Sequence, residues 1–301
     1  GTCRPVGSGT AREGHYRRAP LAGNVPVFDN HFHLDPRGLY LEAAKMFAKA
    51  GGTHLMLTHL PYDDLPLTTG GDYRAAYERT LTTADLVRRE TKLTVFVAVG
   101  PYPVDLIRLD ERFGLEAAVA VMKEGMDIAA DLVREGKVTA LGEIGRPHFP
   151  VASDLWDASN EILRHGMAAA KDAGCAVILH TEDPTPDVFE EFGRIADSVG
   201  LPRQKVVKHH APPLVLEGEC HGVVPSVLAR EDHLREALAK GGAFLMETDY
   251  IDDPRRPGAV LGPATVPRKT AKLRTLGVMT EEDADRIHRQ LPERTYAISL
   301  E

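Results

Sequence analysis

Short apolar, β-branched runs alternate with helical patterns along most of the chain. Between the runs lie segments that are apolar at three- and four-residue intervals, over residues 39–52, 73–90, 115–136 and 153–174. Strands that alternate with helices predict parallel pairing through crossover connections. The predicted strands occupy residues 25–31, 53–59, 93–100, 138–145, 175–181, 205–210, 222–229 and 242–249.

Eight strand and helix units predict one (β/α)8 TIM barrel. The chain of 301 residues has room for the roughly 250 residues that such a barrel needs. It lacks the glycine-rich first turn of a doubly wound sheet. The second half is less regular, so some distortion is expected. We assign residues 25–301 to the barrel and residues 1–24, rich in Gly, Pro and Arg, to an N-terminal extension.

The overall charge and the cysteines limit the binding partners and the cellular compartment that we expect for the protein. A formal net charge of -8 gives no general nucleic-acid or anionic-membrane surface, although a local basic groove stays open. The three cysteines are widely spaced and form no CxxC pair, which favours a reducing compartment. Without an apolar run of about 20 residues or a signal-peptide core, we expect a cytoplasmic protein with no membrane partner.

Side chains that bind metals occur at the ends of five predicted strands. Active sites of TIM barrels lie at the carboxyl ends of the strands, so these side chains are expected to meet there. His31 and His33 lie two residues apart and therefore share one face of a strand, where both can bind one cation. A half-exposed strand with two polar residues would be the alternative for this pair alone. The candidate ligands are His31, His33, Glu143, His180, His209 or His210, and Asp249.

Imidazole and carboxylate ligands together suit Zn²⁺, Mn²⁺ or a similar divalent ion. The number of candidate ligands predicts two ions that share Glu143 as a bridge. Zn²⁺ is favoured, with Mg²⁺ and Mn²⁺ as alternatives. In strand six, an inward His210 would place Lys208 inside the barrel, whereas an inward His209 lets Lys208 extend outward among the helices. We therefore favour His209 as the ligand and place His210 beside it.

Five motifs in this order resemble the signatures of the TatD family of metal-dependent hydrolases, in particular its archaeal TatD-related branch. They are DNHFHLD, GEIGRPH, VILHTED, VVKHH and METDYIDDPRRPG. The resemblance extends from about residue 25 to the end of the chain and implies two divalent ions. It implies a first ion bound by His31, His33 and Asp249, a second bound by His180 and His209, and a bridging Glu143. Where many members have GxHP, this chain has Gly100-Pro101-Tyr102-Pro103.

A water held between two cations has a lowered pKa and can attack phosphorus or a carbonyl carbon. Asp249 is the expected acceptor of its proton, and Glu143 the second catalytic residue. The resemblance implies a deoxyribonuclease-like attack on a phosphodiester in an oligonucleotide or small molecule. The alternative is hydrolysis of an amide or ester, as in a deacylase, lactonase or cyclic amidase. Candidate substrate contacts are Arg146, His148, His59, His210, Arg255 and Arg256.

Three further acidic residues have structural interpretations. Asp29 shares the parity of His31 and is expected either to orient that ligand or to join a buried polar pair. Asp35, before Pro36, predicts a helix N-cap with proline at the first helical position. Glu247 shares the face of Asp249 and is expected beneath the metals.

Overall fold

The computed structural model describes residues 25–256 and 259–300, and it contains one parallel sheet of eight strands. Each strand pairs with the next along the chain, in the order β1 to β8. A bridge between Phe32 and Tyr250 brings the first and last strands together, so the sheet forms a nearly closed barrel. The strands are β1 Phe28–Phe32, β2 His54–Thr58, β3 Thr94–Val99, β4 Ala140–Gly145, β5 Ala176–His180, β6 Val206–Ala211, β7 Val224–Leu228 and β8 Leu245–Glu247.

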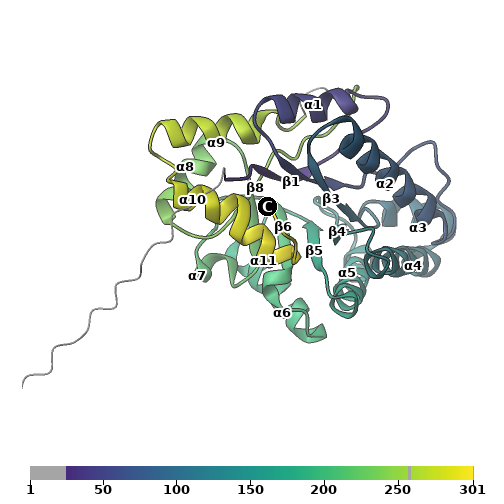
Figure 1. Ribbon diagram of the computed structural model, residues 1–301. Coiled ribbons are helices and arrows are strands. Elements are labelled where there is room, and N and C mark those ends of the chain that lie inside the picture. Colours follow the sequence, from purple (N-terminus) through teal and green to yellow (C-terminus); the bar gives the residue numbers. More distant parts are fainter. Residues whose placement is uncertain (1–24, 257–258, 301) are drawn as a thin grey trace, which may run out of the picture.

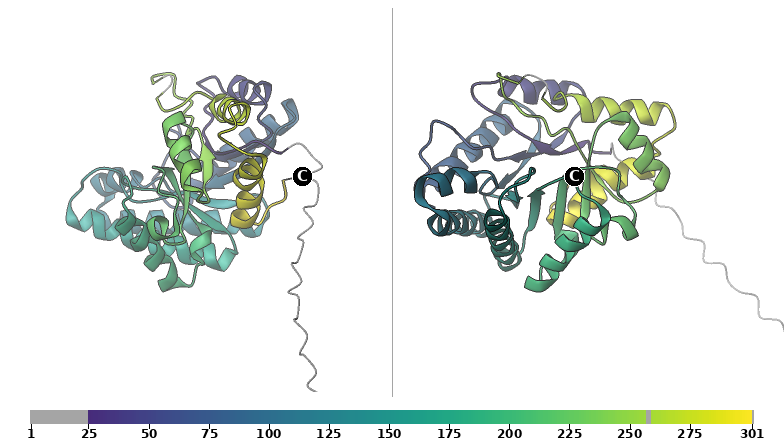
Figure 2. Two further views of the ribbon diagram at one scale, coloured as in Figure 1. Left: turned by 90° about the vertical axis from the view of Figure 1, so that its left-hand side faces the viewer. Right: turned by 180° about the vertical axis from the view of Figure 1, so that it is seen from behind.

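Helices surround the strands, as the views in Figures 1 and 2 show. The fold is therefore the predicted TIM barrel. The predicted extension over residues 1–24 lies outside the described residues. The helices are α1 Leu41–Lys49, α2 Asp72–Glu90, α3 Asp105–Phe113, α4 Leu115–Arg134, α5 Ser153–Ala173, α6 Pro186–Val199, α7 Glu217–Cys220, α8 Glu231–Lys240, α9 Thr265–Thr275, α10 Glu281–Asp285 and α11 Leu291–Tyr296, with short helical turns at Arg203–Lys205 and Arg286–Gln290.

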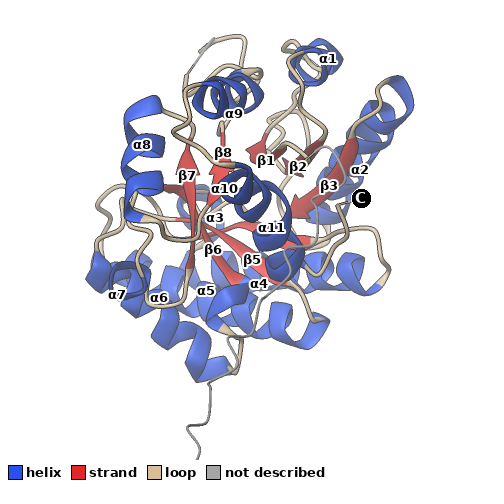
Figure 3. Ribbon diagram, turned by 60° about the vertical axis from the view of Figure 1, so that its left-hand side comes forward, coloured by secondary structure: helices blue, strands red, loops and turns tan. Residues whose placement is uncertain are grey.

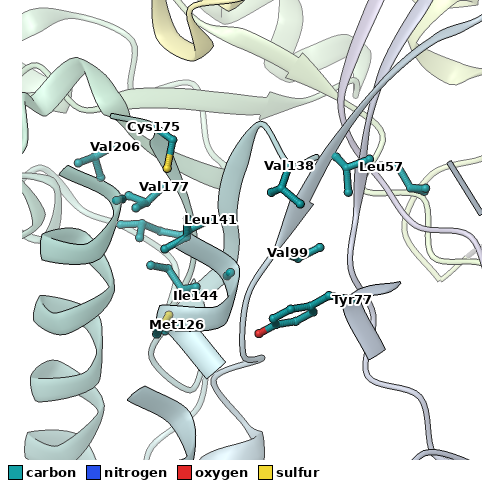
Figure 4. Packing of buried hydrophobic residues seen from close by; sticks show 14 of the residues in the cluster. Leu57, Tyr77, Val99, Met126, Val138, Leu141, Ile144, Cys175, Val177 and Val206 are labelled. Carbon is teal, nitrogen blue, oxygen red and sulfur yellow. The ribbon is translucent and has the colours of Figure 1, made fainter. Parts of the chain in front are cut away.

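The apolar alternation of the strands divides the core into an inner and an outer part. In β3, Val95, Val97 and Val99 pack outward against the helices. Ala98 of the same strand packs inside the barrel. Figure 4 shows the outer part, where side chains from β4, β5 and β6 form one cluster and Met126 of α4 lies beside Ile144 of β4. This two-sided burial explains why the strands are nearly continuous apolar runs.

The amino-terminal end of the barrel is closed by apolar side chains. Phe28 lies inside the barrel together with Leu291 and Tyr296. The rings of Phe28 and Tyr296 are 6.4 Å apart. Figure 3 shows α10 and α11 beside this part of the sheet. The opposite, carboxyl-terminal end therefore remains for a site.

Three strands interrupt their regular pairing at the residues that the sequence analysis selected as ligands. The register shifts between Asp29 and Phe32 in β1, between Gly142 and Ile144 in β4, and between Lys208 and Ala211 in β6. In β4, Leu141 and Ile144 both pack in the outer part, so strict alternation fails between them. Bulges of this kind redirect side chains next to active sites.

The predicted helix start at Asp35 and Pro36 is wrong, because residues 36–40 form turns and α1 begins at Leu41. Asp35 instead accepts a hydrogen bond from the backbone N–H of Arg37 at 2.8 Å, and so stabilises a turn.

Within the described parts of the chain, no helix has both the length and the apolar character required to cross a membrane.

Candidate metal centre

Five strands deliver imidazoles and carboxylates to the carboxyl-terminal mouth of the barrel. The side chains of His31, His33, Glu143, His209 and Asp249 are almost completely buried. His180, at the end of β5, is partly exposed. They form two overlapping groups of possible metal ligands, His31 with His33, Glu143 and Asp249, and Glu143 with His180 and His209.

The first group converges within a few ångströms. The Nε2 atoms of His31 and His33 are 3.1 Å apart, and Nε2 of His31 is 2.7 Å from Oε1 of Glu143. Oδ1 of Asp249 lies 3.7 Å from Nε2 of His33. Metal–nitrogen bonds of about 2.0–2.1 Å in a tetrahedron place neighbouring ligand atoms about 3.3 Å apart. These four side chains therefore fit one divalent cation.

The second group shares Glu143 with the first. Nδ1 of His180 is 3.1 Å from Nε2 of His209 and 3.5 Å from Oε2 of Glu143. Nε2 of His209 is 3.4 Å from Oε1 of the same carboxylate. The Glu143 carboxylate thus contacts imidazoles of both groups, Oε1 near His31 and His209 and Oε2 near His180, as a bridging carboxylate must.

The buried carboxylates require positive charge at this mouth. Burial opposes protonation of His33, but hydrogen bonds to Asp249 and Glu143 outweigh it and raise the pKa of His33 to about 10. Burial also disfavours the charged form of Glu143, yet the neighbouring His180 and His209 hold its pKa well below the usual range. The donor set is thus anionic, buried and made of nitrogen and oxygen atoms, which suits a divalent cation.

Local hydrogen bonds orient the imidazoles. Nδ1 of His33 lies 3.0 Å from the carbonyl oxygen of Thr58 and donates there, so Nε2 is the nitrogen that faces Glu143 and Asp249. Asp29 accepts hydrogen bonds from the backbone N–H groups of His31 and Thr248 at 3.2 and 3.0 Å. Asp29 thereby joins β1 to the end of β8, and it orients the His31 backbone from this junction.

The glycines of the GEIG motif permit the close approach of β4 and β5. Gly145 has a φ of 143°, and a Cβ atom there would overlap the carbonyl oxygen of His180. A Cβ at Gly142 would lie 2.7 Å from Cβ of Ile178. The motif therefore allows Glu143 to lie next to His180, because Gly142 and Gly145 have no side chains that would keep β4 and β5 apart.

Strand β6 turns His209 toward the other ligands and His210 toward Asp249. His210 has a φ of 52°, and its Nδ1 lies 2.9 Å from Oδ2 of Asp249. The His210 backbone N–H donates to Oε1 of Glu247 at 2.6 Å. Glu247 is fully buried and also accepts a hydrogen bond from Ser226. Glu247 therefore lies beneath the ligands, in the position expected from its parity.

The expectation that Lys208 extends outward among the helices is wrong. Its side chain is buried, and Nζ donates to the carbonyl oxygen of His209 at 2.6 Å. Burial lowers its pKa to about 8. Lys208 contributes to the wall of a cavity of ≈ 400 Å³ at the mouth, here called the central cavity. Parity alone gave no indication of this position.

The central cavity contains most of the predicted substrate contacts. His148 lies in its wall with Nδ1 2.9 Å from Nε2 of His180, and His210 lies nearby. Arg255 and Arg256 also line the cavity, but both form ion pairs with Asp253. Their contact with a substrate stays a prediction. Sequence reasoning missed Arg37, Tyr102 and Arg108, which come from loops and α3 and carry no motif signal.

Arg146 lies away from the mouth, whereas His59 follows β2 and lines a neighbouring cavity, so its contact with a substrate stays a prediction. The side chain of Arg146 is 0% exposed, forms ion pairs with Glu182 and Glu191, and packs over Trp156 at 4.3 Å. It does not lie on the mouth, because the carboxylates and rings of the helical layer hold it inward. Nδ1 of His59 lies 2.9 Å from Oγ1 of Thr80, and its ring lines a neighbouring cavity.

The barrel and this mouth of clustered imidazoles and carboxylates define a metal-dependent hydrolase of the TIM-barrel class. A family model described as TatD related DNase matches residues 28–297. The chain therefore belongs to the TatD-related family.

A relative that aligns over most of both chains supports this assignment, and a solved structure shares the fold. The uncharacterized protein MJ1127 of Methanocaldococcus jannaschii is 40% identical over 284 residues, which cover 92% of this chain and 98% of that protein. The uncharacterized metal-dependent hydrolase YabD of Bacillus subtilis is 30% identical over 114 residues, 35% of this chain and 37% of YabD. The structure of YjjV, a TatD homolog from Escherichia coli, has a TM-score of 0.60 at 20% identity and covers 90% of this chain and 98% of its own.

Proposed function

We propose that this protein hydrolyses phosphodiester bonds with two divalent cations, Zn²⁺ in first place, at the mouth of the barrel. The observation that carries the proposal is Glu143, whose carboxylate contacts imidazoles of both groups, with Oε1 near His31 and His209 and Oε2 near His180. His31, His33 and Asp249 would hold one ion, and His180 and His209 the other. Such ions, when bound, lower the pKa of a water and stabilise developing negative charge.

The protein side chains position the reactants. Asp249 has one oxygen near His33 and the other 2.9 Å from His210, so its carboxylate is fixed between them. In this position it can orient an attacking water and accept its proton. Asp249 has a φ of 48°, a conformation that costs energy and often occurs at functional sites.

Two cations in the cavity wall favour an anionic substrate. Lys208 and Arg108 line the central cavity and form no ion pair within the described part of the chain. Each retains N–H donors for a phosphate oxygen. An uncharged ester or amide would neutralise neither cation, so a phosphodiester is the better candidate.

The first test is metal analysis of the purified protein followed by four assays. The substrates are single-stranded DNA, bis(p-nitrophenyl) phosphate, p-nitrophenyl acetate and an acyl anilide. We expect about two metal ions per chain and metal-dependent cleavage of the two phosphodiesters. Less than one ion per chain, or cleavage of only the ester or anilide, would contradict the proposal.

A second test compares neighbouring residues. Asp249→Asn should lose phosphodiester cleavage, whereas Asp232→Asn, on the exposed surface of α8, should retain it. His209→Ala should lose more metal than His210→Ala, since only His209 faces Glu143. Equal metal loss in the two histidine variants would refute the assignment of His209 as the ligand.

A further inference from the structure

A second cavity, of ≈ 230 Å³, adjoins the central cavity and is here called the side cavity. It lies between the loop that follows β2 and helices α2 and α3. The two cavities share Pro61, Asp63 and Arg108 in their walls. None of the metal-ligand candidates lines the side cavity. A group attached to a substrate in the central cavity can therefore extend into it.

The side cavity combines ring and aliphatic surfaces. Tyr62 and Tyr73 contribute aromatic rings, and Leu65 and Leu109 contribute apolar contacts. Sites for whole drug-sized ligands usually enclose about 300–1,000 Å³, so this smaller volume suits a single planar ring system. Aromatic and aliphatic walls of this kind contact a flat heterocycle well.

One buried carboxylate provides a polar contact in this cavity. Asp105 is 4% exposed, and its Oδ2 accepts a hydrogen bond from the Tyr73 hydroxyl at 3.3 Å. Its Oδ1 has no hydrogen-bond partner in the described part of the chain. Burial raises the pKa of Asp105 to about 6, so the carboxylate is still mostly ionised at neutral pH. An ionised carboxylate accepts hydrogen bonds and is matched by a ligand with N–H groups.

Arg108 stands where the two cavities meet. Its side chain is exposed and forms no ion pair with any described residue. A guanidinium in this position can bind a phosphate that crosses from the central to the side cavity. A ligand that carries a planar ring with N–H donors next to a phosphate is a nucleotide.

We propose that the side cavity is a nucleobase subsite. It would accept a base with an exocyclic amino group, such as cytosine, that donates to Oδ1 of Asp105, because carboxylates pair with such amino groups. This inference rests on the proposed phosphodiesterase function, to which it adds a nucleotide as the substrate. Bases without an amino group would bind more weakly.

The subsite can be tested with cytidine, which carries a base and no phosphate. Binding of cytidine to the metal-loaded protein is measured by calorimetry, with ribose as the negative control. Ala76→Phe introduces a ring into the side cavity and should weaken cytidine binding at least tenfold. The matched control is Ala75→Phe, one residue along α2 on the exposed surface, which should bind cytidine as the native protein does.

Asp105→Asn keeps the shape of the cavity and tests the same inference if Ala76→Phe does not fold. It should weaken cytidine binding at least fivefold and should reduce the preference for d(CpC) over d(TpT) in kcat/KM. Ala76→Phe should lower the ratio of kcat/KM on d(CpC) to that on bis(p-nitrophenyl) phosphate at least tenfold. An unchanged ratio would contradict the subsite.

The two proposals fail in different ways. If the native protein does not bind cytidine, or if both variants bind it normally, the nucleobase subsite is refuted whatever bonds are cleaved. If cytidine binds in the side cavity but neither phosphodiester is hydrolysed, the proposed function is refuted and the subsite stands.

Discussion

The two ends of the barrel differ in what their side chains contribute. At the amino-terminal end, Phe28, Leu291 and Tyr296 bury apolar surface inside the barrel. At the carboxyl-terminal end, buried histidines and carboxylates take up the same kind of interior space. Apolar burial stabilises a fold, whereas burial of charged groups costs stability unless they are paired. The closed end therefore supports a mouth that is arranged for binding and chemistry.

A row of hydrogen bonds connects the two ends. The Tyr296 hydroxyl donates to Oδ1 of Asn30 at 2.7 Å, and Asn30 donates to Oγ of Ser226 at 3.0 Å. Ser226 in turn donates to Glu247, beneath His209. These polar groups lie inside an otherwise apolar barrel, so each needs its partner to remain satisfied.

The largest expected effect comes from the bridging carboxylate. Glu143→Gln removes the negative charge shared by the two ligand groups, so metal content should fall below one ion per chain. Phosphodiester cleavage should drop by at least about 10³-fold, or about 4 kcal/mol. The measurements are metal analysis and kcat/KM, with Glu161→Gln on the exposed surface of α5 as the control. Unchanged metal content would mean that Glu143 is not a ligand.

A substitution at the closed, amino-terminal end should lower the stability of the fold. Phe28→Ala leaves a void between Phe96 and Tyr296 and should destabilise the fold by about 3–4 kcal/mol. Urea unfolding measures this change, with the exposed Phe113→Ala as the control. Metal content of the folded variant should stay at the native value. A loss of metal as large as in Glu143→Gln would contradict the view that the amino-terminal end stabilises the fold while the carboxyl-terminal end binds the metal.

Near the mouth, removal of a buried charge should stabilise the protein. The folded-state pKa of Asp105 is about 6, against an ordinary 3.8, so folding favours the protonated form. Its ionisation therefore costs stability as the pH rises from about 4 to about 6. Asp105→Asn should raise the free energy of unfolding at pH 8 by about 3 kcal/mol, and roughly half of that gain should remain at pH 5. A gain that is independent of pH would rule out this cause.

The smallest expected effect concerns the hydrogen bonds between the ends. Tyr296→Phe removes the hydroxyl that donates to Asn30 and should cost about 1–2 kcal/mol of stability. Metal content and kcat/KM should change less than twofold, because Ser226 still bonds Glu247. Tyr296→Phe is compared with native protein by urea unfolding and activity. A tenfold loss of activity would show that the row of hydrogen bonds positions the ligands.

Much of the fold followed from local patterns. The eight predicted strands overlap β1 to β8, and the four predicted helical segments overlap α1, α2, α4 and α5. The ligand candidates also meet at one mouth, because the ends of parallel strands are neighbours whatever the loops do. The predicted helical segment 153–174 ends at Gly174, which has a φ of 75° and ends α5 in the structure.

Other features could not follow from local patterns. Arg146 was expected at the mouth, but Glu182 and Glu191, distant in sequence, hold it in the helical layer. Lys208 was expected outside, but the cavity at the mouth left space for its side chain. The side cavity involves residues from a loop and two helices, and no spacing in the sequence brings them together.

The sequence by itself determined the alternation of strands and helices and the types of side chain at the strand ends. These depend on short-range periodicity and on residue chemistry. Only the tertiary structure decided where those side chains point. The bulges in β1, β4 and β6 interrupt the two-residue alternation of side chains between the faces of a strand, on which the sequence-based assignment relied. A bulge depends on pairing with neighbouring strands. The directions of the Glu143 and Lys208 side chains therefore follow from packing across the whole barrel.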